Sequence, residues 1–157
     1  MGLRPYNIDD LPKLREFTLH KEQHSFTMMP VESLALCNND STRHAIVLEE
    51  DGEIVTFFVL HEKEGVAPYS TSSDAILLRA FATNAIHQRK GYGKKALQSL
   101  PLYINKHFPN INTIYLTVYL FNERARLLYK KMGFTDTGAR EIRSSGELIV
   151  MKWEILE

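Results

Sequence analysis

The stretch FATNAIHQRKGYGKKALQSL, residues 81–100, combines two glycines, four cationic side chains and a helical pattern of apolar residues. An apolar run ends at Ala82, and a helix is expected to begin within Gly91–Gly93. The N-terminus of such a helix presents unpaired N–H groups and the positive end of the helix dipole, and glycines let the backbone approach a ligand closely. The four cations are Arg89, Lys90, Lys94 and Lys95. Together these features predict a phosphate or pyrophosphate site.

Three phosphate-binding loops compete for this stretch. A P-loop needs glycine where Gln88 stands and Ser or Thr where Lys95 stands, so it is rejected. The dinucleotide fingerprint Gly-x-Gly-x-x-Gly/Ala matches the letters of residues 91–96, but eight residues separate it from Ala82 and no acid follows before Glu123. A charged helix start without any ligand is the plain alternative.

The third loop, Gln/Arg-x-x-Gly-x-Gly/Ala, is matched by QRKGYG at residues 88–93. A second pattern, Asn-x-x-Ala-x-x-x-Tyr-x-x-x-Gly-Phe, is matched by NERARLLYKKMGF at residues 122–134. At these two motifs the sequence resembles the GCN5-related N-acetyltransferase (GNAT) superfamily, loosely nearest to small-amine acetyltransferases of the spermidine type. Two motifs in order with a strand between them are more specific than either alone, and they cover residues 75–134.

The composition is that of an ordinary globular chain. It has 157 residues, and we expect one domain over residues 1–157. Lys+Arg and Asp+Glu are both 19, so bulk charge gives no reason to expect a nucleic-acid or membrane-surface partner. No apolar run approaches the ~18 residues of a membrane span and residues 1–10 lack a signal-peptide core, so a cytoplasmic location is expected.

Cys37 is the single cysteine, which excludes an intrachain disulfide and suits a reducing compartment. We interpret it as a small buried hydrophobe rather than a nucleophile. No metal site is expected.

The N-terminal half reads as a strand, two short helices and a hairpin. We predict a strand over residues 1–8, a helix capped by Asp9 and Asp10, and a second helix over 31–37. Apolar runs at 45–49 and 54–60 flank an Asp-Gly turn, which predicts a β-hairpin. A polar loop is expected over 64–74, with a role in shaping the substrate site.

The C-terminal half begins with a nearly continuous apolar run at 75–82, typical of a central strand. A helix over 92–107 contains Pro101, which should kink or restart it. The remaining predicted elements are a strand at 113–119, a helix at 122–132 ended by Gly133, and a hairpin of 134–142 with 148–156. This order indicates an α/β domain with a mixed sheet. The resemblance implies the GNAT fold: a mostly antiparallel, twisted sheet of about seven strands, flanked by about four helices, with splayed parallel central strands.

The resemblance also implies acetyl-CoA, bound where strands 75–82 and 113–119 splay apart. The pantetheine arm is expected along the strand backbone and the pyrophosphate on the loop N–H groups, with any of the four cations meeting the 3′-phosphate. The expected cofactor-binding residues are Phe81, Ala82, Thr83, Gln88, Arg89, Lys90, Gly91, Tyr92, Gly93, Lys94 and Asn122.

The implied activity is N-acetyl transfer to a primary amine of a small molecule or a peptide N-terminus, by direct attack in a ternary complex. A backbone N–H near residues 81–83 would stabilise the oxyanion. Tyr129 matches the family tyrosine that donates a proton to the departing thiolate, whose pKa as a free thiol is ~8.5. Without the motif, Tyr129 would be read as a core aromatic.

The acceptor side is less determined. Many relatives carry Glu or Asp near the position of Arg79, and its replacement by arginine disfavours a polyamine acceptor. Arg79 either binds a substrate carboxylate or, as we favour from the sequence, pairs with a neighbouring acid. Glu22 and His24 are candidate acceptor-site residues and bases, or exposed polar residues. An acyl-CoA-binding module with a sensory or partner-dependent role is the alternative function, and homodimerisation stays open.

Overall fold

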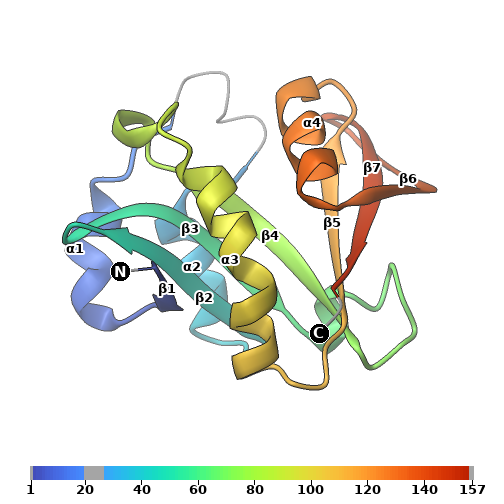
Figure 1. Cartoon of the computed structure of the whole chain (residues 1–157), viewed down its shortest axis with the longest axis horizontal. Helices are drawn as coiled ribbons and strands as arrows, with labels where there is room; N and C mark the ends of the chain where they lie inside the picture. Colours follow the sequence, from blue (N-terminus) through green and yellow to red (C-terminus); the bar gives the residue numbers. More distant parts are fainter. Residues whose placement is uncertain (1, 20–26, 156–157) are drawn as a thin grey trace.

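The computed structural model describes residues 2–19 and 27–155 and contains one seven-stranded sheet in the order β1-β2-β3-β4-β5-β7-β6 (Figure 1). The strands are β1 (Gly2–Pro5), β2 (Arg43–Glu50), β3 (Glu53–His61), β4 (Ala75–Thr83), β5 (Thr113–Tyr119), β6 (Thr135–Arg143) and β7 (Gly146–Glu154). Only β4 and β5 run parallel, and the other neighbours are antiparallel. The predicted mixed, mostly antiparallel sheet is therefore confirmed.

Four α-helices cover the two faces of the sheet. They are α1 (Leu11–Arg15), α2 (Pro30–Cys37), α3 (Tyr92–His107) and α4 (Glu123–Met132). Because side chains alternate along a strand, β2 sends Val47 into a core with α1 and α2, and Ile46 into a core with α3 and α4. The sheet thus lies between two helical layers. No helix in the described part of the chain is long and apolar enough to span a membrane.

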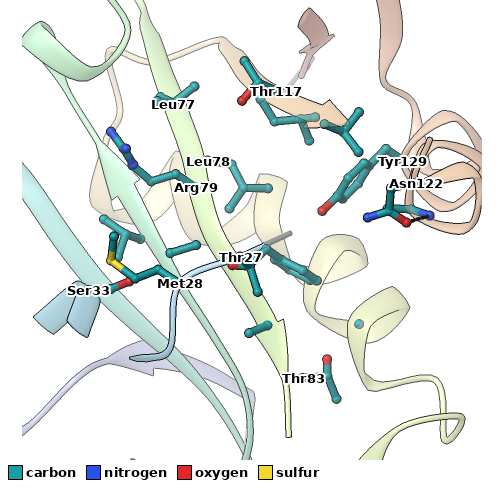
Figure 2. Close-up of a pocket in the computed structure, with 18 of the residues that line it drawn as sticks. Thr27, Met28, Ser33, Leu77, Leu78, Arg79, Thr83, Thr117, Asn122 and Tyr129 are labelled. Atoms are coloured by element: carbon teal, nitrogen blue, oxygen red, sulfur yellow. Dashed lines mark hydrogen bonds between the residues drawn. The ribbon is translucent and has the colours of Figure 1, made fainter. Parts of the chain in front are cut away.

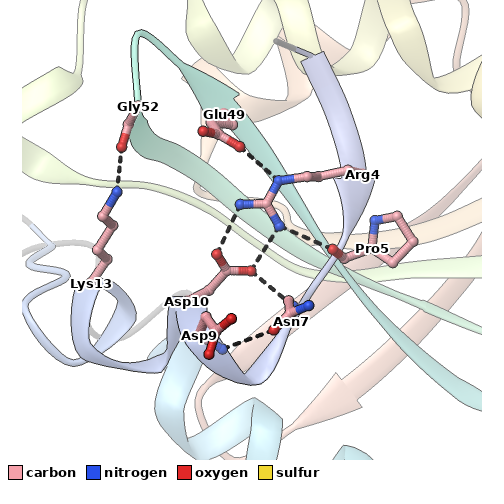
Figure 3. A network of polar contacts seen from close by, with 8 residues as sticks. All are labelled: Arg4, Pro5, Asn7, Asp9, Asp10, Lys13, Glu49 and Gly52. Atoms are coloured by element: carbon pink, nitrogen blue, oxygen red, sulfur yellow. Dashed lines mark hydrogen bonds and ion pairs between the residues drawn. The ribbon is translucent and has the colours of Figure 1, made fainter.

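The N-terminal segment differs from the prediction. β1 ends at Pro5, and Asn7, not the Asp pair, caps a short 3-10 helix (η1, Ile8–Asp10) by accepting a hydrogen bond from the Asp9 N–H at 2.9 Å. Asp10 is buried and accepts two hydrogen bonds from Arg4, both 2.8 Å, while Arg4 Nε donates to Glu49 at 2.7 Å (Figure 3). The Asp10 carboxylate also accepts from the Asn7 N–H at 2.8 Å, so it completes the cap of η1 while it pairs with Arg4.

The other elements lie within a few residues of their predicted bounds. Loop 64–74 contains part of a second 3-10 helix, η3 (Lys63–Gly65), and no strand. α3 continues through Pro101 without restarting, so a restart there was wrong. Leu97, Leu100 and Ile104 are buried on one face of α3, as the apolar spacing predicts.

The parallel pair opens after three residues. Ala75–Leu77 pair with Thr113–Tyr115, and no pairing joins β4 to β5 beyond them in the described structure. The predicted splay is confirmed.

A β-bulge lies on the other side of β4. Val59 pairs with Arg79 and Phe57 with Ala82, so β4 holds one extra residue. Ala80 adopts a left-handed φ of 56°, and the extra residue turns Phe81 toward the α3 and α4 layer. The bulge shapes the strand where the splay occurs.

Candidate active site

A cavity of about 780 Å³ opens where β4 and β5 separate. Its loop half is lined by the end of β4, the loop into α3, the start of α3, and α4 with its cap, at residues 81–83, 87–89, 91–94, 122, 124, 125, 128 and 129. Its arginine half is lined by Asp40, Arg43, His61, Tyr69, Arg79 and Arg143. The site thus combines an anion-binding helix start with a separate basic wall.

The loop half exposes backbone donors at the start of α3. Gly91 is the N-cap with φ 80°, and Arg89 also has a positive φ of 67°. The first bond of the helix runs from the Lys95 N–H to the Gly91 carbonyl, 2.9 Å. The N–H groups of residues 92–94 therefore have no backbone partner in the described structure. Gln88 closes the turn, because its side-chain amide donates to the Thr83 carbonyl at 3.0 Å.

Of the four loop cations, two line the cavity and two do not among the described residues. Arg89 and Lys94 line the cavity, and Arg124 of α4, which the sequence interpretation missed, joins them. Lys95 forms an ion pair with Glu50, whose side chain is buried, so its proposed role at the 3′-phosphate loses support. Lys90 is exposed and is not among the described lining residues.

Tyr129 lies on the cavity face of α4. Its ring packs edge-on against Phe81 and Phe134, with centroid distances of 6.2 and 5.7 Å. In Figure 2 its hydroxyl points from α4 toward β4, and no hydrogen-bond partner for it occurs among the described residues. Burial raises the pKa of this phenol above its usual 10, so the hydroxyl stays protonated at neutral pH.

Asn122 caps α4, since its side-chain oxygen accepts from the Ala125 N–H at 3.3 Å, and it also lines the cavity. Phe81, Ala82 and Thr83 lie on the part of β4 that has no strand partner toward β5. Their stretch of backbone can therefore pair with an extended ligand.

Arg79 is the centre of the arginine half. Its Nη1 donates to His61 Nδ1 at 3.2 Å, and no carboxylate lies within ion-pair distance among the described residues. The expected pairing with a neighbouring acid is therefore wrong for the described structure. Burial and the charges of Arg43 and Arg143 lower the pKa of Arg79, which marks a crowded cationic environment.

His61 lines the cavity beside Arg79 and accepts a hydrogen bond from it. Because an arginine only donates, Nδ1 of His61 is the acceptor, and the proton sits on Nε2, 3.5 Å from Asp40 Oδ2. Burial, with help from Arg43 and Arg79, lowers the pKa of His61 below 6.5, which keeps the ring neutral at neutral pH. Gly65 packs against this ring so closely that any Cβ there would overlap it.

Comparison with known proteins decides the family. The model of the acetyltransferase (GNAT) family matches residues 8–134. The chain belongs to this family. It is 39% identical over 152 residues to an uncharacterized N-acetyltransferase, YbbJ, of Bacillus subtilis (strain 168), covering 96% of this chain and 95% of the relative. The protein is thus a GNAT N-acetyltransferase.

Two solved structures show the same GNAT fold at low identity. The aminoglycoside acetyltransferase AAC(6')-Ib, in complex with coenzyme A, superposes with a TM-score of 0.76 at 18% identity, covering 98% of this chain and 94% of that one. A chimera of the spermidine N-acetyltransferase SpeG from Vibrio cholerae with hSSAT gives 0.70 at 19% identity, covering 97% and 93%. Both similarities support the GNAT fold of this protein.

The GNAT motifs account for the loop half only. Glu22 and His24 lie outside the described residues, although Leu19 and Thr27, on either side of that stretch, line the cavity. The arginine-half residues belong to no motif; strand register brings them together, since Arg43 pairs with His61 and His61 with Leu77, two residues before Arg79. In the sequence, the arginine half was indicated only by Arg79, which stands where many relatives carry Glu or Asp.

Cys37 is half-buried on α2 and packs against the core beneath it. Burial raises the pKa of its thiol, which opposes a nucleophilic role. It is not among the described residues that line the cavity.

Proposed function

We propose that the protein transfers the acetyl group of acetyl-CoA to a primary amine of a small molecule or a peptide N-terminus, in a ternary complex. The observation that carries the proposal is the continuity of the open β4 edge with the bare N–H groups at the start of α3. One surface can so accept both an extended amide chain and a pyrophosphate. The coenzyme A in the aminoglycoside acetyltransferase supports the same donor here.

The residues of the loop half fit acetyl-CoA in charge as well as in shape. N–H groups of residues 92–94 and the side chains of Arg89, Lys94 and Arg124 are suited to phosphates. A side chain at Gly93 would lie 3.6 Å from the Phe81 ring, an ordinary contact, so the motif's alternative alanine also fits. We assign the remaining loop residues of the motif, Gln88 included, to holding this turn.

Acetyl-CoA supplies an acetyl thioester to the site. A neutral amine attacks its carbonyl carbon, a C–N bond forms, the C–S bond breaks, and the proton lost by the amine passes to solvent water. Backbone N–H groups near residues 81–83 are placed in the role of oxyanion donors. Tyr129 is protonated at neutral pH, and we assign its hydroxyl the role of hydrogen-bonding and protonating the departing thiolate.

Direct attack is favoured over an acetyl-enzyme intermediate. Burial raises the pKa of the Cys37 thiol and Cys37 is not among the described lining residues, whereas a covalent route needs an activated nucleophile at the thioester. A Cys37→Ala variant should retain its rate of acetyl transfer.

The experiment follows CoA release from acetyl-CoA with a panel of amines, comparing Tyr129→Phe with wild type. Turnover should fall about 10- to 100-fold, with the dissociation constant of acetyl-CoA nearly unchanged. Tyr103→Phe is the matched control, because Tyr103 is a buried residue of α3 and is not among the described residues that line the cavity. Unchanged turnover in Tyr129→Phe contradicts the acid role. Tight acetyl-CoA binding without CoA release from any amine favours the alternative acyl-CoA-binding module.

A further inference from the structure

The charge on the cavity wall is strongly one-sided. Among the described lining residues the acids are Asp40 and Glu64, whereas the arginines and lysines are Arg43, Arg79, Arg89, Lys94, Arg124 and Arg143. Arg89, Lys94 and Arg124 lie in the loop half, where the phosphates of the donor require them. The other three arginines lie on the acceptor side and need a separate explanation.

Two of these three arginines are already neutralised. Arg43 Nε lies 3.2 Å from Asp40, and Arg143 pairs with Glu141, which also accepts a 2.7 Å hydrogen bond from the Tyr69 hydroxyl. Arg79 differs, because its one described polar partner is the uncharged ring of His61. The unmatched positive charge of the arginine half is therefore the Arg79 guanidinium.

The position of Arg79 is fixed rather than adaptable. His61 accepts from one nitrogen of the guanidinium and is itself buried between Gly65 and Asp40. The guanidinium has five donors in a planar fork, and this contact uses one. In Figure 2 the side chain leaves β4 on the side away from Tyr129, so its remaining donors face the arginine half.

Partial burial makes the unpaired charge costly, and its lowered pKa reflects that cost. A carboxylate is the ligand that best offsets it, since the guanidinium fork binds both carboxylate oxygens. A polycation is the least suitable acceptor, because Asp40 is engaged by Arg43 and only the exposed Glu64 has no described ion pair on this wall.

We propose that the arginine half binds a carboxylate of the acceptor through Arg79, so that the acceptor class is an amine that also carries a carboxylate, such as an amino acid or a short peptide. His61 acts as a positioning residue for Arg79. This proposal rests on the proposed acetyl transfer and narrows its substrate class away from polyamines and aminoglycosides.

The first test uses the wild-type protein and matched acceptor pairs. Each amino acid or dipeptide is compared with its own carboxamide by CoA release, alongside spermidine and an aminoglycoside. At least a tenfold higher kcat/KM for the carboxylate member of the best pair supports the proposal. Amidation leaves more of the amine neutral and reactive, so greater nucleophilicity does not explain such a preference.

Other outcomes separate the two proposals. Equal or better turnover of the carboxamides or of spermidine overturns the carboxylate site while acetyl transfer stands. No CoA release from any acceptor, with acetyl-CoA still raising the melting temperature, overturns acetyl transfer and the carboxylate site with it.

The second test changes Arg79 itself. Arg79→Gln should lower kcat/KM for carboxylate acceptors about 10- to 100-fold, mainly through KM, and leave carboxamide acceptors within about twofold. Arg140→Gln, at an exposed arginine outside the described cavity lining, is the control and should change neither. An equal loss toward both members of a pair overturns the proposal, and the acetyl-CoA-dependent rise in melting temperature verifies that the variant is folded.

Discussion

Arg4 and Arg79 leave strands of the same sheet and have opposite surroundings. Arg4 donates to Asp10 at 2.8 Å and to Glu49 at 2.7 Å, and these carboxylates raise its pKa. Arg79 meets a neutral histidine and two further arginines, and burial among them lowers its pKa. Arg4 is ion-paired within the fold, whereas Arg79 is held by a neutral side chain and has no carboxylate partner among the described residues.

This contrast shows how the same residue type comes to serve stability or binding. The Arg4 network ties β1 to β2 and to η1 at the edge of the sheet (Figure 3). Arg79 lies where β4 and β5 have separated, so β5 supplies no partner, and the one described polar partner of Arg79 is the neutral His61 of β3. Under the proposed acceptor assignment, the carboxylate of the substrate is the charge partner of Arg79.

The largest expected effect comes from Arg79→Met. Acetylation of carboxylate acceptors should fall about 100-fold, because the change removes a charge-assisted bidentate contact. The free energy of unfolding should stay the same or rise, since an unpaired, partly buried charge is replaced by an apolar side chain. Steady-state kinetics and urea denaturation of the same preparation measure both. A fall in the free energy of unfolding that accompanies the fall in acetylation would show that Arg79 is a structural residue.

Arg4→Met should behave in the opposite way. Removing one partner leaves the buried Asp10 uncompensated, which should cost about 1–3 kcal/mol. This is less than the roughly 3–5 kcal/mol typical of fully buried pairs, because Arg4 is partly exposed. Its kcat/KM per folded molecule should equal that of wild type. Urea denaturation measures the loss in the free energy of unfolding. A changed KM for the acceptor would contradict the assignment of Arg4 to stability and Arg79 to binding.

Gly91 and Gly93 of the loop half also differ in what they require: Gly91 has a left-handed backbone, whereas Gly93 has not. Gly91→Ala places a Cβ at φ 80°, a left-handed conformation that costs an ordinary residue about 1–2 kcal/mol, so acetyl-CoA should bind roughly tenfold more weakly. Gly93→Ala keeps a helical backbone and meets only ordinary contacts, so binding should stay within about twofold. Titration calorimetry with CoA measures both, and equal effects would contradict the assigned loop geometry.

The smallest effect is a pH dependence of stability. Arg4 lowers the pKa of Asp10 and Glu49 below their usual 3.8 and 4.5. Both groups therefore stabilise the fold above pH 4.5, and this contribution is lost as pH falls through their lowered pKa values. Melting temperatures should decline less steeply between pH 5 and pH 3 in Arg4→Met than in wild type. Parallel plots of melting temperature against pH for the two proteins would show that these ion pairs do not contribute to the pH dependence of stability.

The loop half was largely predictable, whereas the arginine half was not. Local spacing placed Gly91, Gly93 and Asn122 at helix starts, because caps and left-handed turns are local properties. The bulge at Ala80 and the pairing of Arg43 with His61 depend on strand register, which no short motif records. The same limit explains why the sequence predicted the Asp9-Asp10 pair rather than Asn7 as the cap, and why it kept Lys95 among the four candidates for the 3′-phosphate. Long-range partners, Arg4 and Glu50, decide those side chains.

The most direct test of the account is the acceptor preference of an Arg79→Glu variant, measured as the ratio of kcat/KM for an amino acid to that for its carboxamide. In wild type we expect a ratio above about ten. Reversal of the charge should bring it below one and raise turnover of spermidine, because the wall then repels carboxylates and attracts cations. A ratio that is the same in both proteins would contradict the assignment of Arg79 as the acceptor's carboxylate-binding residue.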